Sequence, residues 1–293
     1  MIKIDRQNLD AIARAYFSKI SKKKRNEASR PMRSYFISNF EDIVLAKPDE
    51  FVKIHMQFMK AFNKSNAKSF EEFKIYMSNQ YKDMLGDCGY WLAKELSVNT
   101  CPYCNSQYTF TIDRNRKIRP QFDHFLPKSE YPCLALSFYN LIPCCSTCNH
   151  IKSSDDKELL HPYFAGFGNK FHFKVNHLDY ILENKQIDIE CVKNRNIVKI
   201  EKDFEIRCEN NVRTFALNDL YAQHSDYVGE ILDKAYAYSD DYFVGITEEF
   251  SRMGKSPSEI KRIIFGNYVD RVDHEKRPLS KLTSDVLEQV GFK

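Results

Sequence analysis

The sequence predicts an α+β protein that is mostly α-helical, with a small β-containing core between two helical regions. Apolar residues recur at helical spacing over residues 1–98 and again from Arg213 onward. Between these regions lie short segments in which apolar and polar residues alternate, as they do in half-buried strands. We therefore expect an N-terminal helical region at 1–98, a core at 99–160, and a C-terminal extension at 161–293 with short strands followed by helices.

The N-terminal region contains several signals for the starts of helices. The apolar positions between Leu9 and Phe17 follow one helical face. Pro31 and Pro48 stand where a first helical turn would begin, and Ser69 with Glu72 forms the pattern of a capping box. We expect the last helix of this region to end shortly before Cys101.

The core is predicted to contain a β-hairpin, a long loop and a helix, in that order. Residues 107–112 and 117–122 alternate well enough to form two strands, joined by a polar turn at 113–116. Residues 125–147 contain three prolines and are expected to be irregular. A helix is expected to start near Cys148 and to continue into IKSSDDKELL.

The C-terminal extension is expected to begin with strands and to end with helices. Three strands are predicted at FHFKV, QIDIECV and NIVKIEK. Helices are predicted from Arg213, over a long segment from His224 to Met253, and at SPSEIKRIIF and LSKLTSDVLEQV.

Composition narrows the class of protein. Hydrophobic residues make up 43% and charged residues 29% of the 293 residues, as in ordinary globular chains. No segment approaches the roughly 18 apolar residues of a membrane span, and the N-terminus does not resemble a signal peptide. With nine unevenly spaced cysteines, we expect a cytoplasmic protein without a membrane partner. The absence of a Gly-rich loop excludes P-loop and dinucleotide-binding proteins.

Two Cys-x-x-Cys pairs enclose the core. Cys101 and Cys104 form the first pair, and Cys145 and Cys148 form the second. Four thiolates in two short pairs are typical of a closed, tetrahedral structural zinc site. Cys144 directly precedes Cys145, so the second pair of zinc ligands has an alternative register that includes Cys144.

The segment between the pairs, and the residues after the last cysteine, carry groups suited to phosphodiester hydrolysis. That reaction requires a base for water, a Lewis acid at the phosphate and a cation near the developing charge. His124 is a candidate base, and Asp123 and Asn149 are candidate ligands of a divalent cation. The ammonium of Lys152 is the candidate positive charge near the developing negative charge. Asn140 lies between them in the sequence.

The motifs DHFLPKS and SFYNLIPCCSTCNHIKSS resemble those of the HNH nucleases of the ββα-metal class that are held by two CxxC pairs. The resemblance covers residues 101–157 and implies a zinc-held ββα-metal core. It implies that His124 is the general base, that Asp123 is a ligand of a catalytic Mg²⁺ (or Mn²⁺), and that Asn140 fixes the loop and orients the base.

The third position of the HNH motif falls on Asn149, where many members of the family have His. An amide oxygen is a possible metal ligand, and the neighbouring His150 is an alternative. Lys152 matches a basic residue that is common three positions further on in the family.

The motif block, followed by HPYF and a helical tail, resembles the HNH component of Septu-type and retron-linked anti-phage systems, in which an ABC-type ATPase partner holds the nuclease. We therefore expect a nucleic-acid substrate, with DNA favoured over RNA although the sequence does not separate the two. The helical flanks are expected either to bind a partner or to complete the fold. Basic residues at 22–25 and 114–119 are either phosphate contacts or solvated surface. The alternative function is a non-catalytic, zinc-held scaffold that binds nucleic acid.

Overall fold

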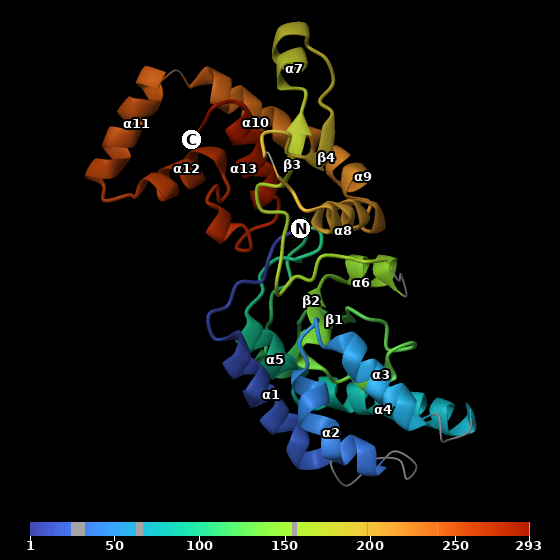
Figure 1. Cartoon of the computed structure of the whole chain (residues 1–293). Coiled ribbons are helices and arrows are strands. Elements are labelled where there is room, and N and C mark those ends of the chain that lie inside the picture. The colour runs from blue at the N-terminus through green and yellow to red at the C-terminus, as the bar shows by residue number, and fades with distance from the viewer. Residues whose placement is uncertain (25–32, 63–66, 154–156, 198, 239, 293) are drawn as a thin grey trace. The chain divides into compact units, whose positions relative to one another are not determined.

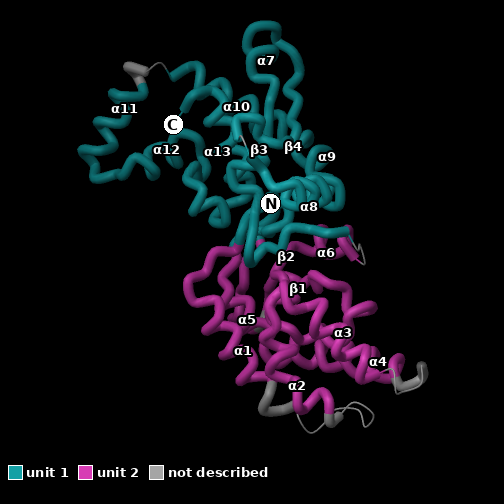
Figure 2. Tube along the Cα trace, viewed as in Figure 1, with its two compact units in different colours: residues 1–3, 99–108, 157–293 teal, residues 4–98, 109–156 magenta. Residues whose placement is uncertain are grey.

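The computed structural model of the chain describes residues 1–24, 33–62, 67–153, 157–197, 199–238 and 240–292 (Figure 1). The chain forms two compact units (Figure 2). One consists of Ile4–Val98 and Thr109–Asp156, and the other of Met1–Lys3, Asn99–Tyr108 and Lys157–Lys293. The described residues are mostly helical, with two small two-stranded antiparallel sheets, so the expected α+β class is confirmed at this level. The division at residues 98 and 160 stays a prediction.

The first 98 residues form helices, as the apolar spacing predicts. These are α1 (Leu9–Lys24), α2 (Arg33–Leu45), α3 (Phe51–Phe62), α4 (Ala67–Asp87) and α5 (Gly89–Leu96). Aromatic side chains pack α2, α3 and α4 together: the ring centroid of Phe73 lies 4.9 Å from that of Phe58 and 6.0 Å from that of Phe36. All three rings are buried, and such aromatic burial is a large part of the packing energy of a small helical core.

Two of the expected helix starts, those at Pro48 and Ser69, were wrong. The expectations for Pro31 and for the basic residues at 22–25 fall on residues or side chains outside the described part of the chain. α4 begins at Ala67, so Ser69 lies inside the helix, and α3 begins at Phe51, three residues after Pro48. Pro31 and Arg25 lie outside the described residues, as do the side chains of residues 22–24.

The strands of the core are not those of the predicted hairpin. They lie at the two ends of the long loop instead. β1 (Gln121–His124) is antiparallel to β2 (Leu141–Cys144), with Asp123 opposite Ile142. Residues 107–112 and 117–122 share only the isolated bridge between Ile112 and Ile118. The interval 125–147, expected to be irregular, thus contains a strand. β2 escaped prediction because all four of its residues are buried, which removes the alternation that marks a half-exposed strand.

The helix of the core is shorter than expected. α6 (Ser146–Lys152) follows β2 directly and contacts β1. Its last backbone bond runs from Ser153 N–H to Asn149 O, and Ser153 has a positive φ of 40°, which ends the helix before KELL. Among the described residues, α6 therefore carries Cys148, Asn149 and Lys152 within two turns.

The second unit contains a two-stranded sheet and seven helices in its described part. β3 (Phe171–Val175) pairs with β4 (Ile189–Lys193), and both strands were predicted. The helices are α7 (His177–Glu183), α8 (Lys202–Thr214), α9 (Leu217–Ala222), α10 (Ser225–Ala237), α11 (Asp240–Arg252), α12 (Pro257–Phe265) and α13 (Ser280–Gln289). The third predicted strand, 196–202, was wrong: its described residues before α8 contain no strand, and Lys202 is the first residue of that helix. Helix α7 was not predicted. The expected helix from His224 to Met253 is two helices, α10 and α11.

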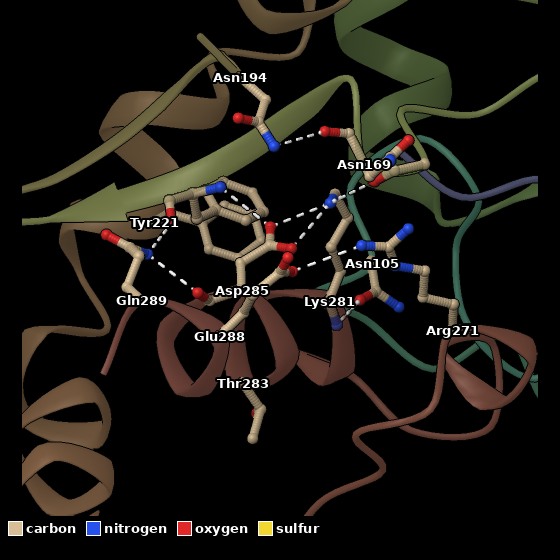
Figure 3. A network of polar contacts seen from close by, with 12 residues as sticks. Asn105, Asn169, Asn194, Tyr221, Arg271, Lys281, Thr283, Asp285, Glu288 and Gln289 are labelled. Carbon is tan, nitrogen blue, oxygen red and sulfur yellow. Dashed lines mark hydrogen bonds and ion pairs between the residues drawn. The ribbon is translucent and has the colours of Figure 1, made fainter. Parts of the chain in front are cut away.

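A buried ion pair within α13 (Figure 3) is linked to β3 by a hydrogen bond. Lys281 Nζ lies 2.9 Å from Asp285 Oδ2, and the side chains are 2% and 7% exposed. The carboxylate also accepts a hydrogen bond from Phe173 N–H at 2.9 Å, and the ammonium donates to Gly168 O at 3.0 Å. Because the ion pair is buried and also bonds to backbone groups of Phe173 and Gly168, the network fixes the register of α13 on the sheet.

None of the helices in the described part of the chain combines the length and the apolar character that a membrane crossing requires.

Candidate functional site

The four cysteines of the two pairs come together. The sulfur atoms of Cys101, Cys104, Cys145 and Cys148 all lie within 4.8 Å of one another, and each side chain is buried. Tetrahedral zinc with Zn–S bonds of about 2.3 Å requires neighbouring sulfurs roughly 3.8 Å apart, so this spacing fits a structural zinc ion. The donors are all thiols, which favour zinc over hard cations such as Mg²⁺.

Local hydrogen bonds shape both pairs as metal-binding turns. Ser106 donates from N–H and from Oγ to Cys104 Sγ, at 3.4 and 3.3 Å. Cys148 N–H donates to Cys145 Sγ at 3.4 Å, in the first turn of α6. Hydrogen bonds of this kind stabilise a thiolate, the form that binds zinc.

The alternative ligand Cys144 is excluded from this cluster of described residues. It lies in β2 opposite Gln121, outside the set of sulfurs that could hold an ion. Burial raises the pKa of its thiol well above the ordinary value, with the nearby Asp123 acting in the same direction, so it is a protonated core residue.

Asp123 and Lys152 form a buried ion pair between β1 and α6. Lys152 Nζ lies 3.2 Å from Asp123 Oδ2 and donates to His124 O at 2.8 Å. The two side chains are 3% and 1% exposed, so both charges are removed from water. Such a pair is tolerated only where each charge has a close partner, and it fixes the orientation of the carboxylate at the end of β1.

His124 is the last residue of β1, and it is 9% exposed. Its Nε2 lies 3.0 Å from Ala135 O, which can only accept a hydrogen bond, so Nε2 carries the proton of the neutral ring and Nδ1 is the basic nitrogen. Burial lowers the pKa of His124 to about 3, with the positive charges of Lys128 and Lys152 acting in the same direction. The imidazole is therefore neutral at physiological pH.

Asn140 holds the loop between β1 and β2. Its Oδ1 accepts from Leu126 N–H at 2.7 Å, and its Nδ2 donates to Leu126 O and Leu134 O at 3.1 and 3.2 Å. The residue is fully buried. Since the oxygen and both amide hydrogens are engaged by the loop that follows His124, the side chain acts as a clamp on that loop.

Asn149 lies on α6 beside β1. Its amide nitrogen donates to Gln121 Oε1 at 2.6 Å, which leaves its oxygen as the candidate metal ligand. His150, the alternative third motif residue, is exposed on the same helix and does not line the pocket described next.

A pocket of about 300 Å³ brings several predicted residues together. Its lining includes Asp123, His124 and Asn149, and also Tyr81, Lys128 and other residues. The remaining lining residues are Phe122, Pro127, Ser129 and Ser153. Lys152 and Asn140 are buried and do not line this pocket. A carboxylate, an amide and an imidazole with one basic nitrogen thus share one small open site.

The sequence pattern missed Tyr81 and Gln121 as parts of this site. Tyr81 comes from α4, 43 positions before His124, and its hydroxyl donates to Phe122 O at 2.8 Å. The sequence analysis did not single out Tyr81, because it lies far from the motif in a helical segment. Gln121 carried no signal, because a polar residue at the start of a strand is ordinary.

The chain is similar to the Septu protein PtuB of Bacillus thuringiensis, with 38% identity over 96 residues. Those residues make up 32% of this chain and 34% of that protein, so the chain spans about a third of the length of the relative it matches. No family model matches the chain. No solved structure matches it either. The similarity supports a link to Septu-type proteins.

Proposed function

We propose that this protein is a metal-dependent HNH endonuclease that hydrolyses phosphodiester bonds in nucleic acid, DNA in the first instance. The observation that carries the proposal is the shared pocket of Asp123, His124 and Asn149 on a strand–strand–helix arrangement. The four-thiol cluster supports it, because two of its cysteines lie at the start of the helix that carries Asn149.

In this proposal the carboxylate of Asp123 and the amide oxygen of Asn149 would hold a catalytic Mg²⁺ or Mn²⁺. When bound, such an ion supplies a Lewis acid for the phosphate and the leaving oxygen. Lys152 keeps the carboxylate of Asp123 in place through their ion pair of 3.2 Å. The carboxylate and amide oxygens of the pocket are hard donors, which suit these cations.

His124 acts as the general base of the proposed reaction. Its Nε2–H is engaged by Ala135 O, so Nδ1 accepts the proton of the attacking water. Burial keeps the ring neutral and ready to accept a proton. The negative charge of a bound phosphodiester favours the protonated ring, which offsets the low pKa during proton transfer. Asn140 positions the base by clamping the loop that contains Ala135.

We further propose that the nuclease is an effector of a bacterial anti-phage defence system and works with an ABC-type ATPase partner. Similarity to a Septu protein over about a third of the chain supports this role. The sequence resemblance to HNH components of such systems points in the same direction.

A cleavage panel tests the proposed activity. Purified protein with Mg²⁺ or Mn²⁺ is incubated with duplex DNA, single-stranded DNA and RNA, alone and with the co-expressed ATPase. We expect cleavage by the parent and none by His124→Ala, with equal zinc content and circular dichroism for both. His150→Ala, which changes the exposed neighbour, is the matched control and should cut. Metal-independent cleavage, or equal cleavage by parent and His124→Ala, would contradict the proposal.

The scaffold alternative is a distinct outcome of the same panel. A scaffold binds nucleic acid in a salt-dependent way and shows no cleavage with either metal or with the partner.

A further inference from the structure

The lining of the pocket includes Tyr81, a residue from outside the sequence motif that carries Asp123 and Asn149. Tyr81 of α4 is 8% exposed, and its ring centroid lies 4.4 Å from that of His124. The ammonium of Lys128 lies 4.7 Å from the centroid of the same ring. One aromatic ring therefore contacts both the candidate base and a lysine that lines the same pocket.

We propose that Lys128, seated on the ring of Tyr81, binds a non-bridging oxygen of the scissile phosphodiester and stabilises the charge that develops on it. This inference rests on the proposed nuclease function and deepens it. It makes helix α4 part of the substrate site, with Tyr81 as the residue that positions Lys128 beside His124.

The first argument is the location of positive charge. Among the described residues that line the pocket, Lys128 carries the one formal positive charge, because His124 is neutral. Lys152, the cation that the sequence suggested, is 1% exposed and already pairs with Asp123 at 3.2 Å. The ammonium of Lys152 is neutralised by that carboxylate, whereas the side chain of Lys128 lines the pocket.

The second argument is the environment of the lysine. Lys128 is half-buried, and this burial lowers the pKa of its ammonium, with the positive charge of Lys82 acting in the same direction. Partial loss of hydration makes a charged group bind an anion more strongly than it would in open water. The aromatic face beneath it restricts the ammonium to one side of the pocket, so little entropy is lost on binding.

The test uses the full-length protein and three variants. Lys128→Met removes the charge and keeps the length of the side chain, and Lys128→Arg keeps the charge. Lys94→Met is the matched control, since Lys94 is exposed in α5 and does not line the pocket. Single-turnover cleavage is measured on the best substrate of the panel over a range of Mg²⁺ concentrations.

Removal of one charge-stabilising donor typically lowers kcat by about 100-fold or more. We expect this loss for Lys128→Met, with the Mg²⁺ concentration at half-maximal rate unchanged. Lys128→Arg should keep at least roughly a tenth of the rate, because it restores the charge. A rate for Lys128→Met within about threefold of the parent, while the parent cuts and His124→Ala does not, overturns the role of Lys128 and leaves the nuclease assignment intact.

A binding experiment decides the inference if the parent does not cut any substrate. Binding of a labelled DNA duplex is followed by fluorescence anisotropy as the salt concentration rises. Loss of one phosphate contact reduces the slope of log K against log salt by about 0.9. We expect this reduction for Lys128→Met and none for Lys94→Met. An unchanged slope for Lys128→Met, or no binding by the parent, overturns the inference.

Discussion

Removal of one partner of the buried ion pair between Asp123 and Lys152 should strongly destabilise their unit. The ammonium and the carboxylate lie 3.2 Å apart, with side chains 1% and 3% exposed. At this separation, Coulomb's law with an effective dielectric constant of about 20 gives an attraction of about 5 kcal/mol. Lys152→Met leaves the carboxylate buried without this partner, and we expect it to lower the free energy of unfolding by about 3–5 kcal/mol.

Urea unfolding followed by tryptophan fluorescence measures the loss of stability in the compact unit that contains the ion pair. The protein has one tryptophan, Trp91, which lies in α5 of the same unit as Asp123 and Lys152. The experiment compares the parent, Lys152→Met, Asp123→Asn and the double variant, with zinc retained and no Mg²⁺ added. Because the double variant contains neither buried charge, its loss should be smaller than the sum of the two single losses by about 1–3 kcal/mol.

A small and additive loss of stability would contradict the burial of this charge pair. A loss below about 1 kcal/mol for Lys152→Met is the value of a solvent-exposed pair. Together with a coupling energy near zero in the double-variant cycle, it would mean that water reaches the pair and that Lys152 does not hold the carboxylate.

Three further predictions concern the zinc cluster, the loop and the base. Cys148→Ser should lose the bound zinc while Cys144→Ser keeps it, as measured by metal analysis of the purified chains; equal zinc in both would contradict the four-thiol assignment. Asn140→Ala removes three hydrogen bonds of a fully buried side chain and should cost about 3 kcal/mol in the Trp91 assay, whereas a loss below about 1 kcal/mol would mean that the loop is held by other contacts. Because the folded pKa of His124 is lowered to about 3, its contribution to stability is complete above the unfolded pKa of about 6.5 and is lost as the pH falls toward 3. The parent should therefore lose about 2 kcal/mol more than His124→Gln between pH 7 and pH 5, and parallel pH profiles would show that the ring is accessible to solvent.

Local patterns predicted the helices and part of the site well. The spacing of Cys145 and Cys148 placed both thiols in one turn, and the structure joins them to Cys101 and Cys104. Short-range apolar spacing likewise identified α1, α12 and α13, because residues three and four positions apart lie on the same face of a helix.

Pairing over long sequence distances was less predictable. All four residues of β2 are buried and one is a proline, so β2 shows no alternation of apolar and polar residues. The residues of β1 lie 17 or more positions upstream of those they face in β2. The predicted hairpin of 107–112 with 117–122 satisfied the local pattern equally well. Only the burial of Phe122 and Ile142 in the packed unit distinguishes the two pairings.

The amino-acid sequence alone established which functional groups the protein has: four thiols in two Cys-x-x-Cys pairs, an Asp-His pair, and Asn149 and Lys152 shortly after the last cysteine. The tertiary structure decided how these groups are used. It buried Lys152 against Asp123, closed the loop with Asn140, and brought Tyr81 and Lys128 to the wall of the pocket. The physical reason is that spacing along a chain sets which residues share a turn, whereas burial and charge pairing depend on contacts between distant segments.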